Sequence, residues 1–186
     1  MAQKSIKLSY NAPFTLSFTL ACVVVLALKV VTGGASNLYV FSVGDGMSLL
    51  NPVSYLRMFL HVLGHAGPEH LVYNLTILLL VGPMLDEKHG WKKLLCVTLV
   101  TGFVTALPML LLPGSLLGAS GVVFAFIILA SYTRAASGAI PMTFVIVCLL
   151  FLGREIYLGI VARDQIAQFA HILGGAVGGF FAIRWK

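Results

Sequence analysis

Long apolar runs separated by short polar stretches set the pattern of this chain. An apolar bilayer core of ~30 Å takes about 20 helical residues, and six of the runs approach or reach that length. We predict membrane spans at residues 14–31, 68–86, 94–112, 118–133, 140–158 and 166–183. The first run could instead be a cleaved signal peptide, but it is long for one and no clear small-residue cleavage site follows it. The pattern therefore predicts an all-α polytopic membrane protein, with one domain over residues 1–186.

The longest stretch between spans covers residues 32–59 and differs from a simple polar linker. It alternates turn formers, such as Gly44-Asp45-Gly46 and Asn51-Pro52, with apolar residues. We predict that this first loop packs at the membrane interface and contains short helices. Beyond it, the spacing of His61 and His65 would place both on one helical face. Pro68 then predicts the start of a new helix.

Composition supports the membrane assignment. The chain of 186 residues is 59% hydrophobic and 10% charged, whereas a soluble domain carries about 25% charged residues. The net charge of +6 comes from basic residues at the ends of apolar runs. Without a basic patch, this charge does not indicate nucleic-acid binding. The three cysteines lie in apolar runs, where they are expected to pack as small hydrophobic residues.

The distribution of basic residues predicts the orientation. Six spans place both termini on one side of the membrane. That side would hold eight basic residues, Lys4, Lys7, Lys88, Lys92, Lys93, Arg134, Arg184 and Lys186. The other side would hold four, Lys29, Arg57, Arg154 and Arg163. The excess predicts cytoplasmic termini, with Ser120 and His171 ~5–10 Å below the outer surface at 1.5 Å per helical residue.

One serine and one histidine are the candidate catalytic pair. Ser120 follows Gly118 at the start of a predicted helix, where developing negative charge is favoured. By itself this pattern is more often a plain helix start. His171 changes the interpretation, because ionisable residues inside apolar spans are expensive and usually functional. Gly174 and Gly178 would let the two helices pack closely, so that His171 could act as base for the Ser120 hydroxyl. No carboxylate lies near His171 in sequence, which predicts a dyad.

The second predicted span offers further polar groups. His70 and Asn74 are four residues apart and share a helical face. Together with the Ser120 amide, they could donate hydrogen bonds to an oxyanion. Asn74 could instead tie two helices together. The glycosylation sequon that begins at Asn74 lies inside an apolar span, so we discount it.

With these motifs, the chain resembles the rhomboid intramembrane serine proteases. The matching residues, in order, are Arg57, His61, His65, His70, Asn74, Gly118, Ser120, Gly121, His171, Gly174 and Gly178. The resemblance implies a six-helix rhomboid-like bundle. It implies Ser120 as nucleophile, His171 as general base, and His70, Asn74 and the Ser120 amide as oxyanion donors.

The resemblance also implies supporting roles. Gly118 would shape the turn before Ser120, His65 would hydrogen-bond within the first loop, and Arg57 would anchor that loop. The fifth span would act as a lateral gate for transmembrane protein substrates taken from the lipid bilayer. No metal or cofactor is implied.

Two positions depart from the family pattern. Phe124 stands where many members have a tyrosine that packs on the catalytic histidine, which argues for a packing role. Asp86 stands where a glutamate usually precedes a glycine, here Gly90, by four residues. We expect Asp86 to affect folding and not chemistry.

Three alternatives compete with a serine protease. A zinc protease would need a different spacing from that of Glu69 and His70. A small transporter would also use intramembrane polar residues, but the chain has no inverted repeat. An inactive rhomboid-like chaperone or binding protein would lack the serine or the histidine. The six-span core without extensions favours a bacterial plasma membrane.

Overall fold

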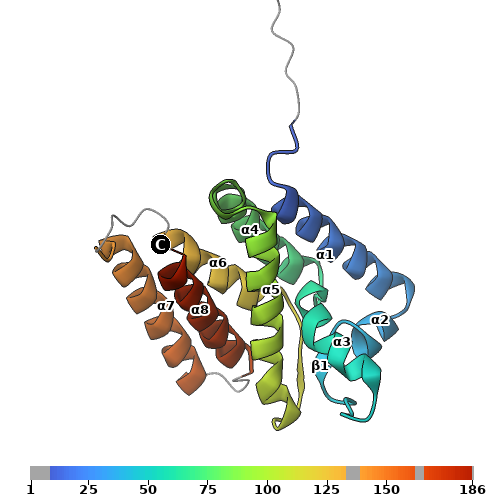
Figure 1. Ribbon diagram of the computed structural model, residues 1–186. Helices are drawn as coiled ribbons and strands as arrows, with labels where there is room; N and C mark the ends of the chain where they lie inside the picture. The colour runs from blue at the N-terminus through green and yellow to red at the C-terminus, as the bar shows by residue number, and fades with distance from the viewer. Residues whose placement is uncertain (1–8, 133–138, 162–165, 186) are drawn as a thin grey trace, which may run out of the picture.

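The computed structural model describes residues 9–132, 139–161 and 166–185 and is mostly helical (Figure 1). The long helices are α1 (Pro13–Val31), α4 (Pro68–His89), α5 (Trp91–Ala106), α6 (Ser120–Tyr132), α7 (Met142–Val161) and α8 (Ile166–Arg184). The short elements are α2 (Ala35–Tyr39), β1 (Val43–Gly44), α3 (Pro52–Leu60), η1 (His61–Leu63), η2 (Leu107–Leu110) and β2 (Ser115–Leu116), where η marks a 3₁₀ helix.

Four helical segments in the described part of the chain are long and apolar enough to cross a membrane. They are α1, α4, α5 continued through η2, and α8. The protein is therefore a multi-pass membrane protein. Helix α6 is apolar but has only 13 residues, which is about 20 Å at 1.5 Å per residue. It contacts α4, α5, α7 and α8, and a helix that is apolar all round is typical of a bundle centre.

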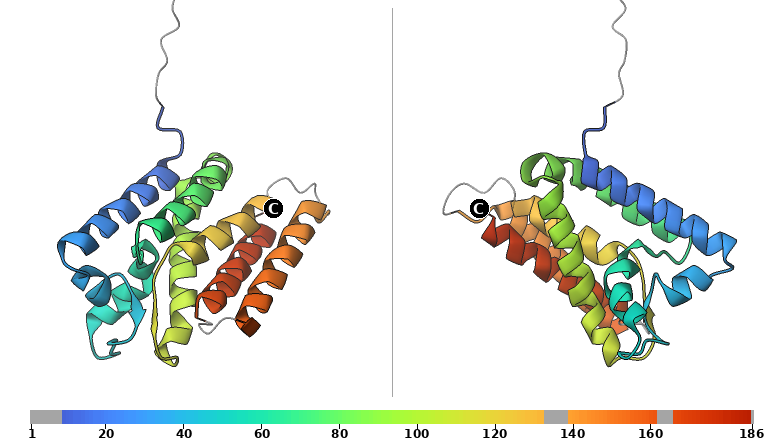
Figure 2. Two further views of the ribbon diagram at one scale, coloured as in Figure 1. Left: turned by 180° about the vertical axis from the view of Figure 1, so that it is seen from behind. Right: turned by 45° about the vertical axis from the view of Figure 1, so that its right-hand side comes forward.

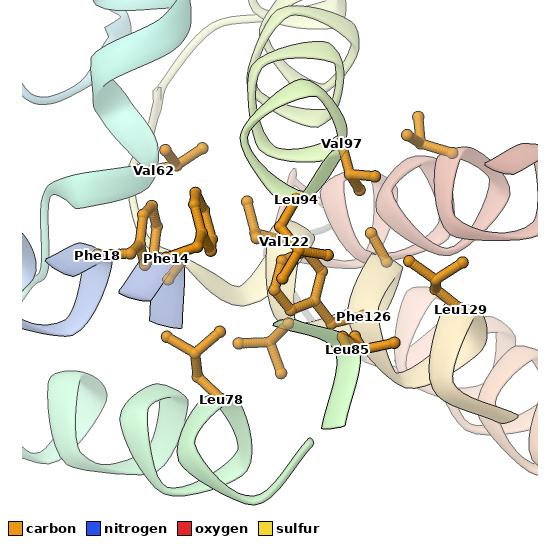
Figure 3. Packing of buried hydrophobic residues seen from close by; sticks show 14 of the residues in the cluster. Phe14, Phe18, Val62, Leu78, Leu85, Leu94, Val97, Val122, Phe126 and Leu129 are labelled. Atoms are coloured by element: carbon orange, nitrogen blue, oxygen red, sulfur yellow. The ribbon is translucent and has the colours of Figure 1, made fainter. Parts of the chain in front are cut away.

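The core surrounds α6 (Figure 3). Phe14 and Phe18 of α1 stack with ring centroids 5.6 Å apart, and the Phe14 ring lies 6.0 Å from that of Phe126. Leucines of α4 and α5 close the cluster around Phe126, which is fully buried. In both views of Figure 2, α1 and α7 lie toward opposite sides of this core.

Asp86 joins α4 to the start of α1. Its carboxylate accepts hydrogen bonds from the Phe14 and Thr15 amides, at 3.3 and 2.8 Å, and from the Thr15 hydroxyl at 2.7 Å. The carboxylate thus satisfies free amides in the first turn of α1, where negative charge is stabilising. Asp86 is 5% exposed, so this position serves the fold, as expected.

The sequence prediction of a polar loop from Asp86 to Lys93 is wrong. Helix α4 continues to His89 and α5 begins at Trp91, so Gly90 alone connects them. Gly90 has a φ of +77°, which glycine adopts without steric cost. Beyond the buried Asp86, the charged residues Glu87, Lys88, Lys92 and Lys93 lie on exposed helix ends, where long cationic side chains are readily accommodated.

The first loop contains short helices, as expected, but one detail of its prediction is wrong. Helix α3 ends at Leu60, His61 belongs to the 3₁₀ turn η1, and His65 follows in an irregular segment. The two histidines therefore do not share a helical face. Strand β1 pairs antiparallel with β2, with Val43 opposite Leu116, and so joins the loop to the segment that precedes α6.

The later helices also adjust the prediction. The predicted span over residues 140–158 corresponds to α7, which is continuous from Met142 to Val161 and so extends three residues further. The first residues of α1 and the last of α8 lie at the same end of the bundle (Figure 1). Five of the basic residues counted for orientation, Lys4, Lys7, Arg134, Arg163 and Lys186, lie outside the described residues.

Candidate active site

Helices α6 and α8 touch through their backbones. A Cβ atom added to Gly174 would collide with the carbonyl oxygen of Gly121, and one added to Gly178 would collide with that of Ala125. No side chain larger than hydrogen fits at either glycine without moving a helix. This close approach, over two turns of each helix, fixes how residues at the start of α6 face residues of α8.

His171 lies at the level of the first turn of α6. Its neighbour Ala170 places a carbonyl oxygen 3.4 Å from the position of a Cβ on Gly121. The imidazole packs on Phe124, with ring centroids 4.5 Å apart. Phe124 is one helical turn after Ser120 and shares its face. The His171 ring therefore lies on the side of α6 that carries Ser120, and both residues are partly exposed.

Gly118 brings α4 to the same place. Its φ is +129°, and a Cβ there would lie 2.7 Å from Cε1 and 2.9 Å from Nε2 of His70. A side chain at this position would displace the imidazole. A positive charge on His171 would act on His70, so the two histidines are electrostatic neighbours. Residues from α4, from the turn before α6 and from α8 thus converge.

His70 and Asn74 can present hydrogen-bond donors. The Ala66 amide donates to His70 Nδ1 in a long bond of 3.5 Å, so a neutral ring carries its proton on Nε2, the nitrogen near Gly118. Asn74 is buried, and its Nδ2 donates to the His70 carbonyl at 3.0 Å. An amide nitrogen has a second hydrogen to donate.

The Ser120 amide is a third donor. Val123 donates to the Ala119 carbonyl at 2.9 Å, which places Ser120 in the first turn of α6. Amides in a first turn have no carbonyl of their own helix to bind, and the positive end of the helix dipole lies there. Negative charge beside Ser120 would therefore be stabilised.

The rhomboid domain model matches residues 52–185. The chain belongs to the rhomboid family. A comparison with curated protein sequences gave no match. In this rhomboid, the matched region begins at α3 and includes each of the converging elements described above.

The first loop holds the segment before Ser120 in place. The Gly118 amide donates to the His61 carbonyl at 3.0 Å. Asp45 and Gly114 form a reciprocal pair: the Asp45 amide donates to the Gly114 carbonyl, and the Gly114 amide donates to Asp45 Oδ1, each at 2.9 Å. These bonds and the β1–β2 pair attach the loop to residues 114–118, directly before Ser120.

Arg57 anchors the other side of β1. Its Nε donates to the Ser42 carbonyl at 2.6 Å and its Nη2 to the Asp45 carbonyl at 3.3 Å. The side chain is 4% exposed, and burial lowers the pKa of its guanidinium. The cation is balanced by carbonyl oxygens, and the contact fixes both ends of the strand that pairs with β2.

Two histidines of the loop are buried. His61 Nε2 is 3.0 Å from the Gly102 carbonyl of α5, and His65 Nδ1 is 3.1 Å from the Leu63 carbonyl. Burial lowers the pKa of each to about 4, so both are neutral near pH 7. The His65 ring also meets the edge of His70, with centroids 5.1 Å apart, and so supports the ring nearest Gly118.

Sequence reasoning missed one contributor, Asp45, which clamps Gly114. Gly121 belongs to the predicted motif, and it is the residue that receives Gly174. Gly44-Asp45-Gly46 was noted only as a turn, and its acidic residue was the available signal for a loop clamp. No group of three His, Cys, Asp or Glu side chains in the described ranges is placed to hold a metal ion.

Proposed function

We propose that this rhomboid is an intramembrane serine endopeptidase that cleaves transmembrane segments near the outer face of the membrane. Ser120 is the nucleophile and His171 the general base. The observation that carries the proposal is the contact of Gly121 with Gly174. It brings α8 against the first turn of α6 and packs the His171 ring on Phe124, along the face that carries the Ser120 hydroxyl.

The reaction would proceed in two steps. His171 takes the Ser120 hydroxyl proton as Oγ attacks a substrate carbonyl carbon. The tetrahedral intermediate then collapses, the C–N bond breaks, and His171 returns the proton to the leaving amine. In the second step His171 takes a proton from water, which attacks the acyl ester and releases the carboxylic acid. The proton returns to Ser120.

Three donors would stabilise the oxyanion in each step: the Ser120 amide, His70 Nε2–H and Asn74 Nδ2–H. The removal of one such donor from an enzyme typically costs about 10²–10³ in kcat. The Gly118 turn supports this assignment, because the absence of a Cβ lets the His70 ring approach. Phe124 supplies the surface that orients His171, since no carboxylate is assigned to that role.

The membrane arrangement of the proposal has six crossings, with α6 and α7 added to the four long apolar spans. The ends of the chain would lie in the cytoplasm, and a bacterial plasma membrane is the expected location. A substrate helix would enter from the bilayer between α4 and α7, unwind, and present a peptide bond to Ser120.

Cleavage of a transmembrane reporter in proteoliposomes tests the proposal. Wild-type protein should cleave it, whereas Ser120→Ala and His171→Ala should abolish cleavage with unchanged thermal unfolding. Ser131→Ala is the matched control: it lies on the same helix, and its hydroxyl donates to the Ile128 carbonyl, away from the first turn. Wild-type cleavage by Ser120→Ala would refute the dyad. An uncleaved reporter that stays bound to wild-type protein would indicate a rhomboid-like binding protein instead.

A further inference from the structure

The C-terminal end of α8 lies at the opposite end of the bundle from the first loop (Figure 1), and a basic and aromatic cluster forms there. His89 ends α4, Lys93 lies in the first turn of α5, and Trp185 directly follows α8. The Trp185 ring centroid is 5.5 Å from that of His89 and 5.0 Å from Lys93 Nζ. We call Lys88, His89, Lys93 and Trp185 the Trp185 cluster.

The basic groups of this cluster are close to each other, and none of them forms an ion pair with a carboxylate within residues 9–132, 139–161 and 166–185. The charges of Lys88 and Lys93 both act on the His89 ring. Across the described residues, neither lysine forms an ion pair, and the buried carboxylate of Asp86 on the same helix is occupied by the start of α1. His89 Nε2 is buried without a hydrogen-bond partner in the described part of the chain. Like charges held together repel each other, so an anion would stabilise this arrangement.

The surroundings indicate what carries that anion. The cluster lies where apolar membrane helices end, and tryptophan is enriched at membrane interfaces. On α8, Phe180 and Ile183 are 63% and 62% exposed, directly before Arg184. A ligand with an anionic head and an apolar tail would match both the cationic end and the apolar surface beside it. A soluble phosphate would contact only the cationic end.

We propose that the Trp185 cluster binds the phosphate of an anionic glycerophospholipid. Lys88 and Lys93 supply the charge, and Trp185, packed beside His89, supplies the interfacial ring against which Lys93 is held. This differs from a general excess of basic residues on one side of a membrane, because it assigns selectivity to one indole and its neighbours. The binding is independent of cleavage at Ser120.

Fluorescence quenching tests the proposal on the full chain. The sequence has two tryptophans, so Trp91→Phe leaves Trp185 as the reporter. Two samples are prepared in phosphatidylcholine vesicles. Each contains a minor fraction of a lipid whose acyl chains are brominated near the headgroup, which is phosphatidylglycerol in one sample and phosphatidylcholine in the other. Brominated phosphatidylglycerol should quench Trp185 more strongly than brominated phosphatidylcholine. Equal quenching by the two lipids would overturn the proposal, and this comparison requires no change to the cluster.

Two lysine variants locate the selectivity. Lys93→Gln should lower the preference for phosphatidylglycerol about tenfold, because it removes a direct charge-assisted hydrogen bond to the lipid phosphate. Lys92→Gln removes the same charge one residue earlier, where the Nζ atom lies over Trp91. This variant should change the preference for phosphatidylglycerol less than about twofold. Equal effects would show general surface charge and refute the site. Loss of selectivity on addition of excess glycerol phosphate would show that phosphate alone is the ligand, and would refute a lipid site.

Discussion

Gly174→Ala is the sharpest test of how the helices form the site. The added methyl group would collide with the carbonyl oxygen of Gly121, which is backbone and cannot rotate away. Helices α6 and α8 must separate at the level of Ser120 and His171. Overpacking of this kind costs about 1–3 kcal/mol, partly offset by the gain of about 1 kcal/mol from alanine in a helix.

The effect on activity should exceed the effect on stability. A displacement of about 1 Å between reacting groups can lower a rate by about 10²-fold. We therefore expect Gly174→Ala to lose at least that factor in reporter cleavage, while its unfolding free energy falls by no more than about 2 kcal/mol. Reporter cleavage in proteoliposomes and thermal unfolding in detergent measure the two quantities.

Gly179→Ala is the matched control on the same helix. A Cβ there would lie 3.8 Å from Ile128 Cγ2, which is ordinary van der Waals contact. This variant should cleave at the wild-type rate and be equally or more stable, by up to about 1 kcal/mol. If Gly174→Ala retained wild-type cleavage and stability, the α6–α8 contact would not position the dyad, and the reasoning would fail.

Three further predictions follow from the polar contacts. Asp86→Ala should lower the unfolding free energy by about 2–3 kcal/mol, since hydrogen bonds to charged groups contribute about 1.5–3 kcal/mol. Glu87→Ala, on the exposed side of α4, should leave the unfolding free energy unchanged, and thermal unfolding of the two variants measures the difference. Arg57→Met should raise hydrogen exchange of the β1 and β2 amides and lower cleavage; unchanged exchange would contradict the anchoring role. Because burial lowers the pKa of His61 and His65 from 6.5 to about 4, the unfolded chain binds more protons between these values. Their stabilising contribution is complete above pH 6.5 and is lost toward pH 4, by about 3 kcal/mol for each; pH-dependent unfolding of wild-type protein and His61→Asn measures it.

The helical character of the protein could be predicted from its sequence because apolar runs of this length are specific to membrane helices. The starts at Pro68 and Ser120 were predicted well, since proline and glycine mark them. The continuation of α4 to His89 was not predicted, because charged residues at a helix end look like a polar loop in the sequence. Only the fold shows that Asp86 points to α1.

The identity of the candidate site residues could be predicted from the sequence better than the contacts that hold them in place. Ser120 and His171 stood out as polar residues at apolar helices. The turn at His61 could not be foreseen, because the i, i+4 spacing of His61 and His65 fits a helix equally well. The hydrogen bonds between Asp45 and Gly114 join residues 69 positions apart. Local sequence patterns do not predict a pairing over such a distance.

Labelling with a fluorophosphonate tests the central claim most directly, because it reports an activated serine without any need for a substrate. Wild-type protein in vesicles should form one covalent adduct, mapped to Ser120 by mass spectrometry, and Ser131→Ala should label equally. Ser120→Ala should not label, and His171→Ala should label far more slowly. An adduct at another serine, or equal labelling rates for wild-type protein and His171→Ala, would contradict the account.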